Sequence, residues 1–417
     1  MLTQHENDLL TRTGPGTPMG TLMRRYWVPV LFSSQLDRAD GPPQRVTLFS
    51  EKLVAYRDSI GDVGLVQERC PHRGASMFFG RNEEHGLRCV YHGWKFDREG
   101  RCVDMPSEPP ESTFKQKVHI AAYPCIERGG IVWAYMGPPD RKPAFPAIEW
   151  TAVPESHRMT SRHLQQCNWF QGLEGGFDAS HLTFLHRGGT GTPGGRVPLA
   201  TEYEPLPAPF GMIMASGRPQ PEERVQWSLD LMVMPFHKLI NRHGRPDAPI
   251  GAHMWVPVDD ESCMIYSIEY HPDRPLELDE MRRSSDFLYI HAENAPGNDH
   301  CLINRDNDYL VDRDLQASGE SYTGIKGIGM QDCGVQESMG PIADRTQEHL
   351  GRSDILIIQL RRLMLNTLAR LSEGIEPPGL DAASCHVRSA VKVLPKSAVL
   401  GKELTEAIRI PSVVPQT

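Results

Sequence analysis

Two short segments of the chain each place a cysteine close to a histidine. One residue separates Cys70 from His72, and two residues separate Cys89 from His92. A zinc finger usually takes two cysteines from one arm and two histidines from the other. Here each arm brings one of each, so two facing loops would put both thiolates at one end of a site and both imidazoles at the other. This favours a [2Fe–2S] cluster with Cys₂ on one iron and His₂ on the second; a Cys₂His₂ zinc site is the alternative.

The residues around these segments suit an electron-transfer site. Neutral imidazoles leave such a cluster less negative than four thiolates would, which raises its reduction potential. It can then accept electrons from a ferredoxin-like donor and pass them on. Gly74 and Gly93 follow the two histidines and suit loops that turn backbone N–H groups toward the cluster, while Trp94 and Phe96 would shield it.

A second group of potential ligands lies in the helix-like segment 168–186. Asp178 and His181 are three residues apart and would share a helix face. His181 and His186 are five apart, about 140° out of register on a straight helix, so they meet only if the helix distorts or ends between them. Two histidines and a distant carboxylate form the facial triad of non-haem iron oxygenases. A buried histidine pair beside a capping aspartate is the alternative.

The rest of the chain predicts an α+β protein. A short helix is expected over residues 4–12, with Thr3 and Glu6 as a capping box. Short Val-, Tyr- and Trp-rich runs between about 45 and 133 predict a small antiparallel β domain, and the proline-rich stretch 138–146 is a linker candidate. Further strands are expected within 211–271, followed by an amphipathic helix near 353–372. Strands followed by a long helix predict a sheet packed on a helix.

Both ligand segments resemble those of one family. CPHRGA and CVYHGWKFD resemble the Rieske centre of the Rieske non-haem iron aromatic-ring oxygenases, and NWFQGLEGGFDASHLTFLH is similar to their iron-binding signature. The resemblance implies that Cys70, His72, Cys89 and His92 hold the cluster. It also implies that His181 and His186 bind mononuclear Fe(II), and that Asp178 bridges His181 to the partner subunit's His92.

The third iron ligand must be a downstream carboxylate. The candidates in this sequence are Asp332, Glu337, Asp344 and Asp354. The family places an aspartate at the start of the C-terminal helical region, and Asp332 matches that position best.

The resemblance extends over most of the chain, including GTPMGTLMRRYW and QESMGPIADRTQEHLG. These stretches resemble the phthalate 4,5-dioxygenase-like branch, which also contains 5,5′-dehydrodivanillate O-demethylase-like enzymes. It implies an N-terminal segment 1–40, a Rieske domain 41–146 and a helix-grip catalytic domain 147–417, assembled as a homotrimer or stacked hexamer.

The implied function is that of a terminal oxygenase. It would use O₂ and NADH electrons to oxidise an aromatic carboxylate, either by ring dihydroxylation or by O-demethylation of a methoxylated acid. The alternatives are a Rieske electron carrier and a hydrophobic-ligand-binding helix-grip protein without oxygenase activity. A carrier would not need the long region after Pro146.

Composition excludes other classes. A net charge of −9 gives no basic surface for nucleic acid, and no apolar run is long enough to span a membrane. The polar N-terminus does not resemble a signal peptide, so we expect a cytoplasmic protein whose nine cysteines are reduced. No nucleotide fingerprint is present, so a separate reductase is expected to oxidise NADH.

Substrate contacts are not identified by any motif. Arg187, Arg196, Arg242 and Arg245 could bind a substrate carboxylate, although surface arginines are the commoner explanation for each. The glycine-rich loop 187–196 lacks a Walker pattern and is interpreted as a mobile rim over the active site, with ordinary disorder as the alternative.

Overall fold

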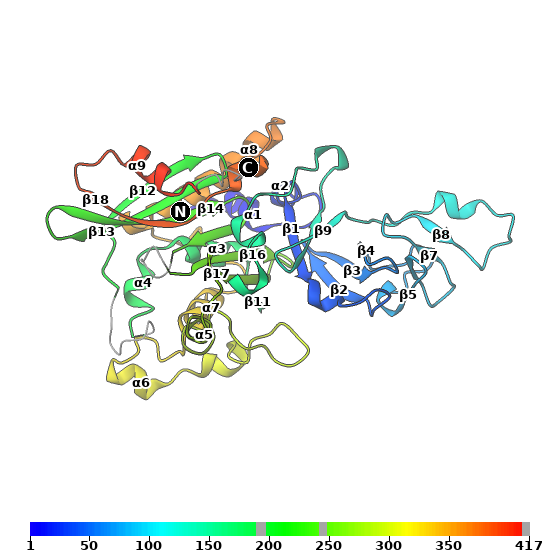
Figure 1. Cartoon of the computed structure of the whole chain (residues 1–417), viewed down its shortest axis with the longest axis horizontal. Coiled ribbons are helices and arrows are strands. Elements are labelled where there is room, and N and C mark those ends of the chain that lie inside the picture. The colour runs from blue at the N-terminus through cyan, green and yellow to red at the C-terminus, as the bar shows by residue number, and fades with distance from the viewer. Residues whose placement is uncertain (189–196, 242–247, 411–417) are drawn as a thin grey trace. The chain divides into compact units, whose positions relative to one another are not determined.

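The chain forms two compact units. A computed structural model describes residues 1–188, 197–241 and 248–410. One unit runs from Thr13 to Pro143, and the other joins Met1–Arg12 to the residues from Ala144 onward (Figure 1). Within the described ranges, each helix is too short or too polar to cross a membrane.

The smaller unit is built from three small antiparallel sheets, as the short apolar runs predict. Their orders are β1-β10-β9, β2-β3-β4 and β5-β6-β7-β8. A short helix, α2 (Pro18–Met23), precedes them. The strands are β1 (Trp27–Phe32), β2 (Gln44–Leu48), β3 (Glu51–Arg57), β4 (Val63–Gln67), β5 (Arg81–Glu83), β6 (Gly86–Arg88), β7 (Lys95–Phe96), β8 (Cys102–Asp104), β9 (Cys125–Arg128) and β10 (Ile131–Tyr135).

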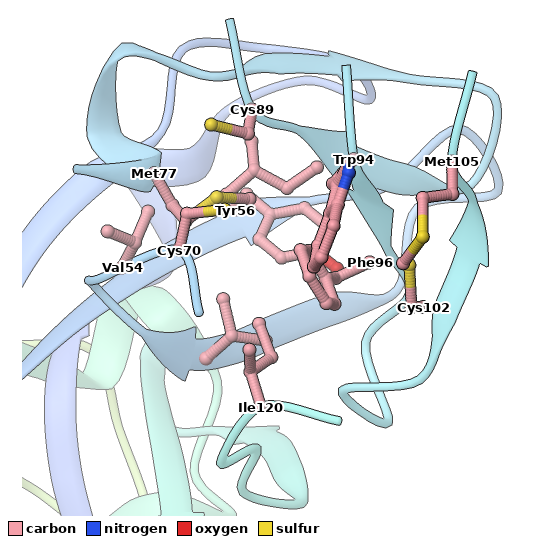
Figure 2. Packing of buried hydrophobic residues seen from close by; sticks show 12 residues of the cluster. Val54, Tyr56, Cys70, Met77, Cys89, Trp94, Phe96, Cys102, Met105 and Ile120 are labelled. Atoms are coloured by element: carbon pink, nitrogen blue, oxygen red, sulfur yellow. The ribbon is translucent and has the colours of Figure 1, made fainter. Parts of the chain in front are cut away.

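An apolar cluster supports the two Cys–His segments of this unit. Val54 and Tyr56 alternate along β3 and so share one face, where they pack with Trp94 and neighbouring buried side chains. Cys70 and Cys89 belong to the same cluster (Figure 2). The cysteines are therefore anchored in a packed core.

The larger unit contains an eight-stranded antiparallel sheet in the order β11-β17-β16-β15-β14-β13-β12. β15 and β18 pair with opposite ends of β14. The strands are β11 (Arg158–Gln165), β12 (Glu202–Ala208), β13 (Gly211–Gln220), β14 (Arg224–Val233), β15 (His237–Ile240), β16 (Ile250–Pro257), β17 (Cys263–Tyr270) and β18 (Ala390–Pro395).

Helices pack on this sheet and on one another, which confirms the predicted α+β class. α3 contacts β16 and α7, and α8 contacts α1, α3 and β12 (Figure 1). Leu356, Leu360, Met364 and Leu368 form the buried stripe of α8 at four-residue spacing. The helices are α1 (Gln4–Thr11), α3 (Trp169–Phe177), α4 (His181–Phe184), α5 (Leu278–Arg282), α6 (Arg313–Ser318), α7 (Ile328–Ser338), α8 (Ile355–Ser372) and α9 (Leu400–Ala407).

Candidate metal centres

The two Cys–His segments form loops of the same shape. In each loop the cysteine N–H donates to the carbonyl five residues on, and the glycine N–H four residues on donates back to the cysteine carbonyl, with N···O distances of 2.8–3.0 Å. Gly74 and Gly93 have φ values of +77° and +78°. Glycine is favoured in this left-handed region because it has no Cβ. The second loop separates β6 from β7. Residues 86–97, one of the short apolar runs in the sequence, therefore form two strands.

The four side chains of these loops lie together as an S₂N₂ donor set. The rings of His72 and His92 are 4.4 Å apart between centroids, and His72 stacks on Trp94 at 4.5 Å. Burial, together with the neighbouring Cys89 thiol, raises the pKa of Cys70 to about 11. His72 Nδ1 is buried without a hydrogen-bond partner in the described structure. Two adjacent sulfurs and an unbonded imidazole nitrogen fit a Cys₂His₂-bound cluster.

The second group lies where a helix breaks. Asn168 Oδ1 accepts from the N–H of Phe170 at 3.0 Å and starts α3, which ends at Asp178 with φ −75° and ψ 116°. Asp178 Oδ1 then accepts from Ser180 N at 2.7 Å. The prediction that one helix carries both Asp178 and His181 is therefore wrong, because Asp178 bonds its own following backbone instead of extending α3. Asp178 and His181 do not share a helix, yet Asp178 Oδ2 lies 3.7 Å from His181 Nδ1.

His181 and His186 meet because α4 ends between them. The prediction that the helix stops or distorts in this interval is confirmed: α4 closes at Phe184. The two Nε2 atoms lie 3.1 Å apart, and the rings cross at 80°. Both imidazoles therefore turn the same nitrogen toward one point.

The structure brings Asp332 to that point from α7. Asp332 Oδ1 lies 3.6 Å from His181 Nε2 and 3.4 Å from His186 Nε2. One ligand atom from each of these residues falls within 4.8 Å of the others. The rival carboxylates bond elsewhere: Glu337 accepts from Gln166 N, Asp344 from Thr346 and Asp354 from Gly351 N.

Outer hydrogen bonds set the tautomer of His186. His186 Nδ1 lies 2.8 Å from Gln331 Oε1, and Gln331 Nε2 donates to the carbonyl of Ile325 at 3.0 Å. The second bond fixes the amide orientation, so the oxygen must accept from His186 Nδ1–H. The Nε2 lone pair then faces Asp332. Sequence reasoning missed Gln331, and its position next to Asp332 was the only available signal.

Asp178 lies behind His181 at a longer distance, with its Oδ2 3.7 Å from His181 Nδ1. Burial alone would raise the pKa of Asp178, but His181 and Ser180 outweigh it and hold this pKa at about 2. The carboxylate is therefore ionised and can accept the Nδ1 proton of His181. Two imidazole Nε2 atoms and one carboxylate fit a divalent iron site.

Three glycines of α3 allow close approach by larger side chains. A Cβ at Gly172 or Gly176 would overlap the Trp255 ring, and one at Gly175 would overlap Gln336. Glycine costs about 1 kcal/mol relative to alanine within a helix. The glycine-rich signature is therefore explained by packing of α3 against β16 and α7.

The triad opens into a cavity of about 410 Å³ in the larger unit. Alternate residues of neighbouring strands line it: Ser216 pairs with Ser228 across β13 and β14, and Trp255 with Ile265 across β16 and β17. Because strand residues alternate between faces, these side chains share one side of the sheet. The volume suits a small organic ligand.

Cationic side chains at this cavity differ from those expected. Arg187 is exposed and is not among the residues lining the cavity. Arg196, Arg242, Arg245 and the loop segment 189–196 lie outside the described residues, so their roles stay predictions. Arg218 and Lys238, which the sequence did not single out, line the cavity.

Comparisons with known proteins identify both units. A Rieske [2Fe-2S] domain matches residues 26–124, and a LigXa C-terminal domain like family matches 134–200 and 229–405. The chain is 40% identical to the 3-chlorobenzoate-3,4-dioxygenase oxygenase subunit of Comamonas testosteroni, covering 94% of this chain and 95% of the relative. It is 38% identical to the phthalate 4,5-dioxygenase oxygenase subunit of Pseudomonas putida, covering 90% and 88%.

A third relative and a solved structure are also similar to this chain. The 5,5′-dehydrodivanillate O-demethylase oxygenase subunit of a Sphingobium species is 34% identical, covering 91% of this chain and 84% of the relative. The solved structure of NdmA from Pseudomonas putida CBB5 shares the fold, with a TM-score of 0.61 at 19% identity over 84% of this chain and 92% of that one. The chain belongs to the Rieske non-haem iron oxygenases, as an oxygenase subunit.

Proposed function

We propose that this oxygenase subunit oxidises an aromatic carboxylate with O₂, using electrons that a separate NADH-dependent reductase delivers. Its named relatives act on chlorobenzoate, phthalate and dehydrodivanillate, which are aromatic acids. The observation that carries the proposal is the His181–His186–Asp332 group, whose ligand atoms lie within 4.8 Å at the wall of the cavity. A bare electron carrier would need neither feature.

The proposal assigns each metal to residues of one unit. Cys70, His72, Cys89 and His92 hold the [2Fe–2S] cluster, and His181, His186 and Asp332 hold iron. When bound, the cluster would supply single electrons and the iron would supply O₂ activation. The proposed cluster and iron domains keep the predicted bounds 41–146 and 147–417, while the predicted segment 1–40 is shared between the two compact units, which divide after Arg12.

The chain's own groups orient this site. Gln331 keeps a proton on His186 Nδ1, so the Nε2 of that ring stays available, and Asp178 Oδ2 lies 3.7 Å from His181 Nδ1, where its charge favours a proton on that nitrogen. Asp332 contributes a negative charge beside them. We propose that the Asp178 carboxylate also accepts from the partner subunit's His92, which links the two centres across a homotrimer or stacked hexamer.

Two reactions fit this site, and one experiment separates them. The reduced, iron-loaded protein would be mixed with O₂ and a panel of plain and methoxylated aromatic acids in a single turnover. Formaldehyde from a methoxylated acid identifies O-demethylation, whereas a cis-dihydrodiol without formaldehyde identifies ring dihydroxylation. The His181→Ala variant is the control and should form neither product.

One result would contradict the proposed substrate class. If neutral aromatic compounds were oxidised and every acid of the panel were left unchanged, the carboxylate proposal would fail while the oxygenase assignment stood. If no compound caused O₂ uptake in the iron-loaded protein, the alternative of a ligand-binding helix-grip protein would gain support.

A further inference from the structure

The strands that line the cavity carry more positive than negative charge on that side. Arg218 on β13 and Lys238 on β15 are both buried, and Asp230 on β14 is the carboxylate nearest to them among the lining residues of these strands. Lys238 Nζ lies 2.9 Å from Asp230 Oδ2 and also contacts the carbonyl of Gly176. Two cations thus face one carboxylate, and that carboxylate is bound to the lysine.

Arg218 is unusual among the buried arginines of the larger unit. Arg345 and Arg361 each bind a carboxylate oxygen, at 2.7 and 2.6 Å. Arg218 is only 8% exposed, yet it has no carboxylate oxygen within 4.0 Å in the part of the chain that the structure describes. Leaving a buried charge without an opposite charge is costly, so an anionic ligand at this position would be stabilised by Arg218.

The hydrogen bonds of Arg218 hold its guanidinium group in place through two nitrogens and leave the third, Nη2, available to a ligand. Its Nε donates to the carbonyl of Pro198 at 2.9 Å, and its Nη1 donates to the hydroxyls of Ser228 at 3.3 Å and Ser216 at 3.5 Å. Its Nη2 donates to no described residue. Burial lowers the pKa of Arg218, opposed by Asp230, as expected for a guanidinium that lacks a close anionic partner.

Apolar side chains line the cavity from strands that β14 and β15 separate from β13 in the sheet. Trp255, Ile265, Leu288 and Ile290 line it from β16, β17 and the segment after α5. An aromatic acid is itself divided in this way, into a flat apolar ring and one anionic group. A ligand with its ring against these residues and its anion at β13 would place the ring beside apolar side chains and the anion beside a cation.

We propose that Arg218 binds the carboxylate of the substrate and selects acids over neutral aromatic compounds. This inference rests on the proposed function and adds to it the residue that recognises the charge. Ser216 and Ser228 are positioning residues that hold the guanidinium, whose Nη2 donates to the carboxylate. The carboxylate supplies the negative charge that the described residues around Arg218 lack.

The test measures binding without turnover. Benzoate, 3-methoxybenzoate and their carboxamides would be titrated calorimetrically into the anaerobic iron-loaded protein, its Arg218→Gln variant and its Arg224→Gln variant. Arg224 is exposed at the start of β14 and is not among the residues that line the cavity, so its variant is the matched control. We expect Arg218→Gln to weaken binding of the acids by about 10–100-fold, the range for loss of a charged hydrogen bond, and to leave the carboxamides within about twofold. Arg224→Gln should change neither.

The outcomes separate this inference from the proposed function. If the wild-type protein binds the acids and Arg218→Gln binds them equally well, the role of Arg218 is overturned while the substrate class stands. If the wild-type protein binds the carboxamides and none of the acids, both fail. Arg218→Lys, which keeps the charge but loses the planar fork, guards against misfolding: it should retain the circular dichroism spectrum and still weaken acid binding.

Discussion

Asp332 joins the two histidines from a helix that lies almost 150 residues further along the chain. We predict that Asp332→Ala abolishes mononuclear iron binding, because two imidazoles alone leave the divalent ion without its carboxylate ligand. Iron analysis should fall to the two irons of the cluster per chain, with the cluster's visible absorbance unchanged. Asp344→Ala is the control, since Asp344 is exposed and accepts a hydrogen bond from the Thr346 hydroxyl. This variant should keep all the iron. Retained mononuclear iron in Asp332→Ala would overturn the assignment.

Asp178 contacts His181 without belonging to the triad. Asp178→Asn keeps the size of the side chain and can still accept from Ser180 N, so we predict that both metals remain. The neutral amide loses the charge that holds His181 and links it to the partner subunit. The rate of cluster oxidation in a single turnover should therefore drop by at least about 10–100-fold. A variant that oxidises its cluster at the normal rate would exclude the bridging role.

Residue spacing predicted ligands better than it predicted what surrounds them. Cys70, His72, Cys89 and His92 could be grouped because each pair lies within one short loop. Gln331 and Arg218 could not, since their roles depend on which strand or helix lies opposite them. A glutamine beside an aspartate, or an arginine in a run of apolar residues, has no chemical signature before the chain is folded.

At the scale of the elements, α3 carries a buried carboxylate, Glu174, that binds two buried arginines. Glu174 accepts from Arg345 at 2.7 Å and from Arg361 at 2.6 Å, and it lies one turn before Asp178. Glu174→Gln would leave two buried guanidinium groups without their shared carboxylate. We predict that the free energy of unfolding at pH 7, measured with denaturant, falls by about 3–5 kcal/mol. Glu348→Gln is the control: Glu348 is partly exposed and, among the described residues, its ion pair is with Arg361 alone, so its loss should cost about 1 kcal/mol or less.

The same carboxylate makes stability depend on pH. Burial alone would raise the pKa of Glu174, but Arg345 and Arg361 lower it below the ordinary value of 4.5. A carboxyl group with a lowered folded pKa stabilises the fold fully above its unfolded pKa and loses that contribution as the pH falls through the folded pKa. The difference in stability between wild type and Glu174→Gln should therefore shrink below about pH 4.5. A constant difference would show that Glu174 acts by packing alone.

Local sequence predicted the elements that have a clear period or cap. α1 has the expected capping box between Thr3 and Glu6. α7 was missed because its buried face includes Gln331 and Gln336, so no apolar period marks it. β11 was missed for a similar reason, since His163 and Gln165 are its buried residues. Tertiary contacts decide these elements, and the sequence alone does not display them.

At the scale of the whole molecule, the proposed electron path crosses between subunits. We predict that Cys70→Ser, without a cluster, and His181→Ala, without mononuclear iron, are each inactive alone. When the two variants are expressed together and purified as mixed oligomers through two different tags, substrate oxidation should return in part. The intact cluster of one chain then serves the intact iron of the next. Mixed oligomers without any activity would contradict a path between subunits and favour one within a single chain.

The alternation of strand residues lets substrate preference and folding evolve almost independently. Ser216, Arg218 and Ser228 face the cavity, whereas the residues between them, such as Gly217 and Trp227, are buried on the other side of the sheet. A lineage could therefore acquire a new substrate through a few point substitutions at every second position, with the core unchanged. Trp255 is a position where substrate preference and folding are coupled, because its ring lines the cavity and also packs against the glycines of α3. Change there would have to be accompanied by change in the helix that ends at Asp178.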